Sequence, residues 1–197
     1  MNRAAIQTAG LNCRQVLPGG ELPGGEEISR VQEVLPSRIH VSFHSKQGLE
    51  IEFTELSDTT FESLVDMYDR FEPKRAAQGL PPTGRDRIFI WLRHLQKNGS
   101  NLVALHEGRV IGHTMLCPVN PSRAEFAIFI DQDYRDQGIG TRFTEVTLEF
   151  ARSKSYLRIW LSVEVNNLRA IRVYKKLGFQ LRDLYGPEQE MEVILEK

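Results

Sequence analysis

The sequence has little cysteine, no long apolar run and almost no net charge. Its two cysteines, Cys13 and Cys117, stand far apart and in no spacing typical of a metal site. No stretch approaches the roughly 18–20 consecutive apolar residues of a membrane-spanning helix, and residues 1–10 lack the basic-then-apolar layout of a secretory signal. We therefore expect a cytoplasmic protein that holds no metal and has no membrane partner.

The charge and length of the chain further limit the kinds of protein that it can be. The 25 Lys and Arg residues nearly balance the 26 Asp and Glu residues, which leaves a net charge of −1. A protein that binds nucleic acid through bulk charge normally has a basic excess, so no nucleic-acid partner is expected. With 197 residues, of which 41% are hydrophobic, the chain has the size and composition of one compact domain.

The beginning of the chain differs from the rest. Residues 1–36 repeat a turn-forming phrase, Pro18-Gly19-Gly20 and Pro23-Gly24-Gly25, and glycine and proline are too dense there for a helix or a long strand. We predict a Gly/Pro-rich arm over residues 1–36 and a single domain over residues 37–197. The arm and an exposed hairpin after it leave room for a homodimer.

Hydrophobic periodicity predicts a mixed α+β fold with helices on both faces of one sheet. Alternating apolar residues on both sides of Gly48 indicate a β-hairpin, and helices, caps and turns follow at regular intervals. After the hairpin at 39–53 we expect helices at 57–70, 83–98, 138–153 and 167–176, and strands at 102–106, 109–116, 125–130, 156–165, 179–184 and 190–195. The segments 71–82 and 118–121 contain prolines and are predicted as loops.

The segment after the strand at 125–130 has the features of an anion site. Gly138 and Gly140 open a helix, whose first turn has unpaired amides and the positive end of the helix dipole. Without Cβ atoms these glycines let a large anion approach the amides. Arg135 can add a charge-assisted contact and Thr141 a neutral one. The pattern therefore predicts a pyrophosphate-sized site, although two glycines at a helix start can also serve capping or packing alone.

A second motif joins the first. Asn166 follows a strand, Ala170 lies in the helix that follows, and Tyr174 precedes Leu177-Gly178-Phe179, which closes that helix. Together with Arg135, Gly138 and Gly140, this pattern resembles the GNAT superfamily of N-acetyltransferases. The tight match covers residues 125–179, and residues 1–48 have no counterpart that can be placed.

The resemblance implies a mostly antiparallel sheet in which two parallel strands, here 125–130 and 157–165, splay apart around acetyl-CoA. It places the pantetheine arm along the strand that ends at Ile130 and the pyrophosphate on the turn before the helix. An asparagine at the end of the other strand would hold pantetheine or an ordered water. The cofactor-binding residues implied are Ile128, Phe129, Ile130, Arg135, Asp136, Gln137, Gly138, Ile139, Gly140, Thr141 and Asn166.

The resemblance also implies direct transfer of the acetyl group to a primary amine of a small molecule or a protein. Tyr174 would then protonate the departing sulfur, although its place on an apolar helix face is equally compatible with packing. The attacking amine must lose a proton, for which Glu125 is the expected base and Glu164 the alternative. The competing function is a non-catalytic acyl-CoA-binding sensor module, which would need neither Tyr174 nor a base.

Three remaining features are less specific. The predicted loop 71–82 is long and charged, and Glu72 is its candidate contact to an acceptor amine. Asn166 could alternatively cap the last helix, a task that the adjacent Asn167 could also perform. The five histidines show no metal-ligand spacing, and we expect them at the surface or at interfaces.

Overall fold

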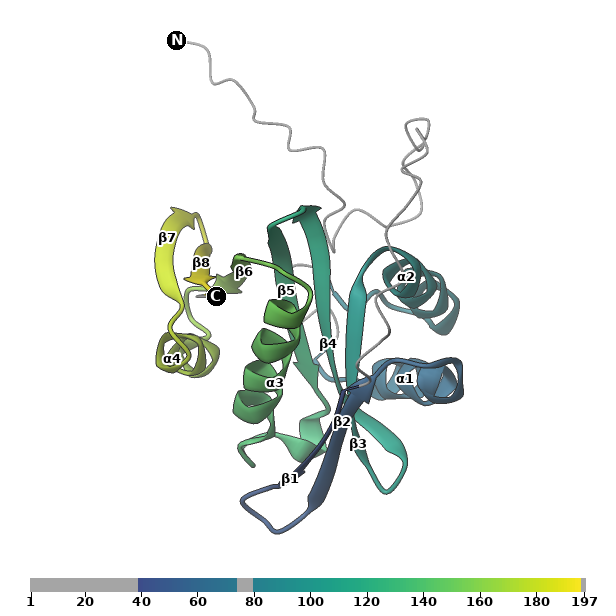
Figure 1. Ribbon diagram of the computed structural model, residues 1–197. Helices are drawn as coiled ribbons and strands as arrows, with labels where there is room; N and C mark the ends of the chain where they lie inside the picture. The colour runs from purple at the N-terminus through teal and green to yellow at the C-terminus, as the bar shows by residue number, and fades with distance from the viewer. Residues whose placement is uncertain (1–38, 74–79, 196–197) are drawn as a thin grey trace, which may run out of the picture.

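One eight-stranded sheet organises the part of the chain that the structure, a computed structural model, describes: residues 39–73 and 80–195. The strand order is β1-β2-β3-β4-β5-β6-β8-β7 (Figure 1). The strands are β1 His40–His44, β2 Glu50–Glu55, β3 Ser100–His106, β4 Arg109–Asn120, β5 Arg123–Ile130, β6 Arg158–Glu164, β7 Gln180–Tyr185 and β8 Glu188–Ile194. The arm expected over residues 1–36 lies outside the described residues.

Helices cover both faces of this sheet, as the sequence predicts. They are α1 Asp58–Arg70, α2 Arg85–Asn98, α3 Ile139–Ser153 and α4 Leu168–Lys176, with a short 3-10 turn η1 at Gln132–Tyr134. The apolar faces of α1 and α2 pack with Val103, Met115 and Phe129 in one core cluster. Those of α3 and α4 pack with Phe53, Leu161 and other strand residues in a second cluster on the opposite face (Figure 1). None of the described helices is long and apolar enough to cross a membrane.

The strands β5 and β6 form the one parallel pair among the described strands, and they part after three rungs. Arg123 faces Arg158, Ala124 faces Ile159 and Glu125 faces Trp160. Beyond that point β5 continues along β4 to Ile130, while β6 continues along β8 to Glu164. The expected α+β fold with two splayed parallel strands is therefore confirmed.

Some local expectations were wrong. The predicted loop at 118–121 is mostly strand, because Pro118 pairs with Ala124 next to a register irregularity, a position where a missing amide is tolerated. The strand predicted at 156–165 is shorter, and Leu157 and Val165 are exposed because they lie just beyond the ends of β6. Leu168 is 63% exposed, since it is the first residue of α4 and precedes the residues that reach the core.

His113 is the histidine for which the expectation of a surface position was wrong. It is 0% exposed in the middle of β4, where its Nδ1 lies 2.8 Å from the Tyr68 hydroxyl and its Nε2 3.1 Å from Asn101 Oδ1. The amide nitrogen of the Asn101 side chain donates to the carbonyl of Leu95, so Oδ1 is the acceptor that faces the ring. Nε2 thus carries a hydrogen. Because burial lowers the pKa of His113 to about 3, the ring is neutral and Nδ1 accepts from the Tyr68 hydroxyl.

Candidate active site

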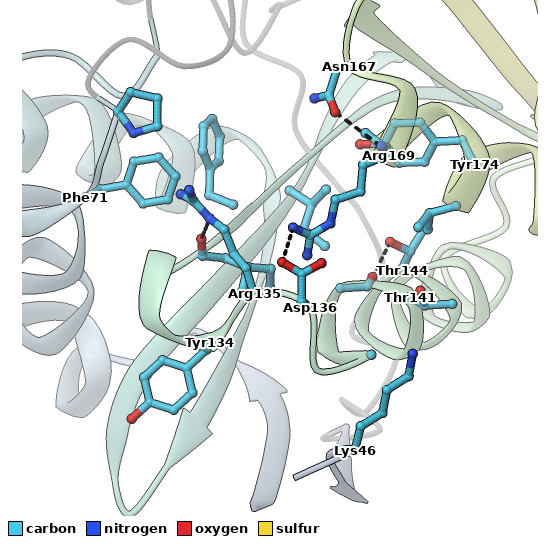
Figure 2. A pocket seen from close by; sticks show the side chains of 18 residues that line it. Lys46, Phe71, Tyr134, Arg135, Asp136, Thr141, Thr144, Asn167, Arg169 and Tyr174 are labelled. Carbon is cyan, nitrogen blue, oxygen red and sulfur yellow. Dashed lines mark hydrogen bonds and ion pairs between the residues drawn. The ribbon is translucent and has the colours of Figure 1, made fainter.

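A cleft of about 540 Å³ opens where β5 and β6 part (Figure 2). One wall is β5 with the end of α1, the floor is the start of α3, and the opposite wall is α4. This arrangement brings together residues from across the chain. The lining residues are Lys46, Phe71, Pro73, Ile128, Phe129, Ile130, Tyr134, Arg135, Asp136, Gly138, Gly140, Thr141, Thr144, Asn167, Arg169, Ala170, Val173 and Tyr174.

The edge of β5 presents backbone groups to this cleft. The amide of Asp131 donates to the carbonyl of Ile111 on β4. Because inward and outward backbone groups alternate along an antiparallel ladder, those of Ile128 and Ile130 point away from β4, toward the gap. The carbonyl of Ile130 accepts from Arg135 Nε at 3.1 Å, while the pairing with β6 has already ended at Glu125. This free strand edge fits an extended pantetheine chain.

The start of α3 forms a cradle for an anion. Gly138 has φ +83°, a left-handed conformation that favours glycine. The first helical hydrogen bond runs from the amide of Arg142 to the carbonyl of Gly138, so the amides before Arg142 precede the helical ladder. A Cβ on Gly140 would meet only Ile130 Cγ1, at 3.7 Å. Gly140 and Thr141 therefore border open space at the positive end of the helix.

The guanidinium of Arg135 does not point to this cradle. Its Nη2 donates to the carbonyl of Glu72 at 2.6 Å, and the group lies 5.0 Å from the centre of the Phe71 ring. Burial lowers the pKa of Arg135, as does the nearby charge of Arg169. Arg135 therefore ties the end of β5 to the segment after α1, and Figure 2 shows it on the Phe71 side of the cleft.

Arg169 and Lys46 are cations of the cleft that the sequence analysis missed. Arg169 Nη1 lies 2.7 Å from Asp136 Oδ2, an exposed ion pair between α4 and the loop before α3. Lys46 comes from the β1–β2 turn and packs beside Gly138. Arg169 could have been predicted, because it stands three residues after Asn166 at a helix start. Nothing in the sequence linked Lys46 to residues some 90 positions away.

Tyr174 lies on the α4 wall and is 9% exposed. Its ring is edge-on to Phe126 at 6.4 Å and lies 5.6 Å from Phe179. Tyr174 therefore packs against the core and also lines the cleft; its role in catalysis stays a prediction. Burial raises the pKa of Tyr174 well above its usual value, so at neutral pH the hydroxyl is protonated and can donate a hydrogen bond.

Several predicted residues lie outside the cleft lining. Gln137 is 4% exposed, with Oε1 accepting from the Ser45 hydroxyl, and Ile139 is buried in the core; only their backbone amides can serve an anion. Asn166 is exposed, whereas Asn167 lines the cleft and caps α4 by accepting from the amide of Ala170, so the cap falls to Asn167 and not to Asn166.

The two predicted carboxylates also lie apart from the cleft lining. Glu125 is buried at the last rung between β5 and β6, on the face that carries Phe129. The backbone of Glu72 is fixed by the Gln132 and Arg135 side chains. In the described residues, no group of three His, Cys, Asp or Glu side chains is placed to hold a metal ion. The roles of Glu125 and Glu72 stay predictions.

The splayed sheet, the glycine cradle and the tyrosine on the facing wall define the fold class of the GNAT acetyltransferases. The model of the acetyltransferase (GNAT) family matches residues 61–179, more than half of the chain and all of the glycine and tyrosine motifs. The chain belongs to this family.

Individual relatives match over shorter stretches. Human N-acetyltransferase 8 is 32% identical over 102 residues, 48% of this chain and 45% of that protein. The spermidine N(1)-acetyltransferase of Escherichia coli K12 is 32% identical over 78 residues, 38% of this chain and 42% of that protein. The chain thus spans about half, or less, of the length of the curated relatives it matches.

Solved structures share the fold at low sequence identity. The GNAT domain of S. lividans PAT superposes with a TM-score of 0.67 at 16% identity, covering 79% of this chain and 97% of that one. The Salmonella typhimurium protein yncA, solved with its cofactor acetyl-CoA, superposes with a TM-score of 0.63 at 15% identity, covering 75% of this chain and 95% of that one. These likenesses establish the architecture around the cleft.

Proposed function

We propose that the protein is an acetyl-CoA-dependent N-acetyltransferase that acts on a primary amine of a small molecule or a protein. The observation that carries this proposal is the cleft between β5 and β6, which has a free strand edge, an anion cradle and a protonated tyrosine on its walls. Membership of the GNAT family supports it.

The residues of the cleft fit acetyl-CoA, which would supply the acetyl thioester. The outward backbone groups of Ile128 and the amide of Ile130 would bind the pantetheine arm as a neighbouring strand would. The amides that open α3, with the Thr141 hydroxyl, would hold the pyrophosphate. The acetyl group then lies near the point where β5 and β6 part.

The chain's groups would divide the chemistry between them. An amide on the edge of β5 polarises the thioester carbonyl as negative charge develops on its oxygen. The amine nitrogen bonds to the carbonyl carbon, the carbon–sulfur bond breaks, and the nitrogen gives up a proton. We propose Glu125 as its acceptor through water, because Glu125 stands where the strands part, while Asp136 is paired with Arg169.

Tyr174 would act on the leaving sulfur. The hydroxyl is protonated at neutral pH, so it would donate a hydrogen bond to the sulfur and then the proton as the carbon–sulfur bond breaks. The phenolate regains a proton from solvent before the next turnover. The acetyl group thereby leaves sulfur for nitrogen, and one proton moves from the amine to solvent or base while another reaches the thiol.

The substitution Tyr174→Phe tests this role. It keeps the ring packed between Phe126 and Phe179 and removes only the proton donor, so we expect kcat to fall by about 100-fold, the lower end of the range for general acid catalysis. CoA release should be measured with a panel of amines that includes spermidine, on which a relative acts by its name.

The same assay separates the enzyme from the sensor alternative. Titration of CoA into both proteins should give similar affinities, since the variant retains the cradle. Steady turnover by the wild type that collapses in Tyr174→Phe supports the proposed reaction. CoA binding without turnover of any amine by either protein favours a sensor, and equal turnover by both removes Tyr174 from the mechanism.

A further inference from the structure

The β1–β2 turn borders the cleft although it lies outside the matched family region of residues 61–179. The amide of Lys46 donates to the carbonyl of Gln137 at 3.0 Å, and the hydroxyl of the buried Ser45 donates to Gln137 Oε1 at 3.2 Å. Gln137 in turn donates to the carbonyl of Asp133. These bonds fix the turn on the loop that leads into α3.

The contacts set the Lys46 side chain over the anion cradle. A Cβ placed on Gly138 would lie 3.6 Å from both Cγ and Cε of Lys46, so the aliphatic stem runs across the face of this glycine. In the view of Figure 2 the side chain extends toward Thr141 at the start of α3. The ammonium group is one bond beyond Cε. It therefore lies at the N-terminal end of α3, where an anion would bind.

Among the residues that the structure describes, three cationic side chains line the cleft, and two of them already have partners. Arg135 donates to the carbonyls of Ile130 and Glu72, and Arg169 pairs with Asp136. Lys46 forms no ion pair with a carboxylate in residues 39–73 and 80–195 and is exposed to solvent. Its ammonium is the cationic group best placed for a ligand at the cradle.

We propose that Lys46 binds the pyrophosphate of acetyl-CoA, with Ser45 and Gln137 as the positioning residues that hold the turn in place. This proposal rests on the proposed function. It assigns to the β1–β2 hairpin a binding role that the glycine motif does not contain, and it replaces Arg135, whose guanidinium faces the other wall, as the cation on the phosphates.

The test is the affinity for three ligands, CoA, 3′-dephospho-CoA and pantetheine, measured by calorimetry. Lys46→Met keeps most of the aliphatic stem and removes the charge. We expect it to weaken CoA and 3′-dephospho-CoA by the same factor, about 5- to 20-fold, as for an exposed charge-assisted hydrogen bond, and to leave pantetheine unchanged. The loss should shrink as salt rises from about 0.05 M to about 0.5 M.

Two further variants serve as controls. Lys46→Arg should restore most of the affinity, because it returns the charge on a stem of similar length. Lys154→Met removes the same charge at the other end of α3, about 22 Å away for 15 residues at 1.5 Å each, and should leave all affinities unchanged. Thermal unfolding checks that each variant is folded.

The outcomes are distinct. Unchanged CoA affinity in Lys46→Met overturns the proposal, and so does a loss for CoA but not for 3′-dephospho-CoA, which would place Lys46 on the 3′-phosphate instead. A wild-type protein that binds no CoA overturns the proposed function itself, and the lysine assignment with it. If the wild type binds CoA and turns over amines, and Lys46→Met binds CoA with equal affinity, only the assignment of Lys46 is refuted.

Discussion

Gly140→Leu is expected to weaken binding of acetyl-CoA by about 100-fold or more while the protein stays folded. Gly140 is the second residue of α3, and a Cβ there meets only Ile130 Cγ1 at an ordinary 3.7 Å. Leucine is also a good helix former. Its side chain would fill the space where phosphate oxygens must reach the amides. Loss of two charge-assisted hydrogen bonds of about 1.5 kcal/mol each corresponds to a loss of affinity of about 100-fold.

Calorimetric titration of acetyl-CoA measures the effect, and Gly140→Ala is the matched control. The methyl group of alanine reaches the same contact with Ile130 but stops short of the cleft, so its affinity should stay within about fivefold of the wild type. Thermal unfolding should rank both variants close to the wild type. If Gly140→Leu bound acetyl-CoA as tightly as the wild type, the anion would not sit at the start of α3.

The elements around this site were predictable because their signals are local. The apolar stripe Ile139, Phe143, Val146 and Phe150 is buried throughout α3, since a helix that packs on a sheet must present one apolar face. The hairpin on either side of Gly48 and the helix start at Ser57 also follow from residues a few positions apart. Periodicity in the sequence was sufficient for the middle of these elements, whereas at the ends of β6 and α4 Leu157, Val165 and Leu168 are exposed.

The failures lie where distant segments meet. His113 is not distinguishable in sequence from an exposed histidine, because its burial depends on Tyr68 and Asn101, which come from other elements. The direction of Arg135 depends in the same way on Phe71 and on the carbonyl of Glu72. A motif predicts that a residue is near a site. The groups that contact its side chain determine toward which wall of the site the side chain points.

His113 also leads to the second large effect, a loss of stability in acid that one residue controls. In the folded protein its pKa is about 3, against an ordinary value of 6.5. Between these pH values the unfolded chain binds a proton that the folded protein does not, so unfolding takes up a proton and stability falls as the pH falls. The expected loss from this residue is about 1.4 kcal/mol in the free energy of unfolding for each pH unit below about 6.5.

Urea unfolding of the wild type and of His113→Gln at pH values from about 7.5 down to about 4.5 measures this slope, because other titrating groups cancel in the difference. The glutamine amide can still reach Asn101 but takes up no proton. The unfolding of His113→Gln should therefore take up about one proton less than that of the wild type, so its free energy of unfolding should fall less steeply with falling pH. Near pH 7.5 the variant should be less stable by about 1–3 kcal/mol. His44→Gln, which makes the same substitution at an exposed position of β1, is the matched control. Parallel curves for the wild type and His113→Gln would contradict the neutral state of the buried ring in the folded protein.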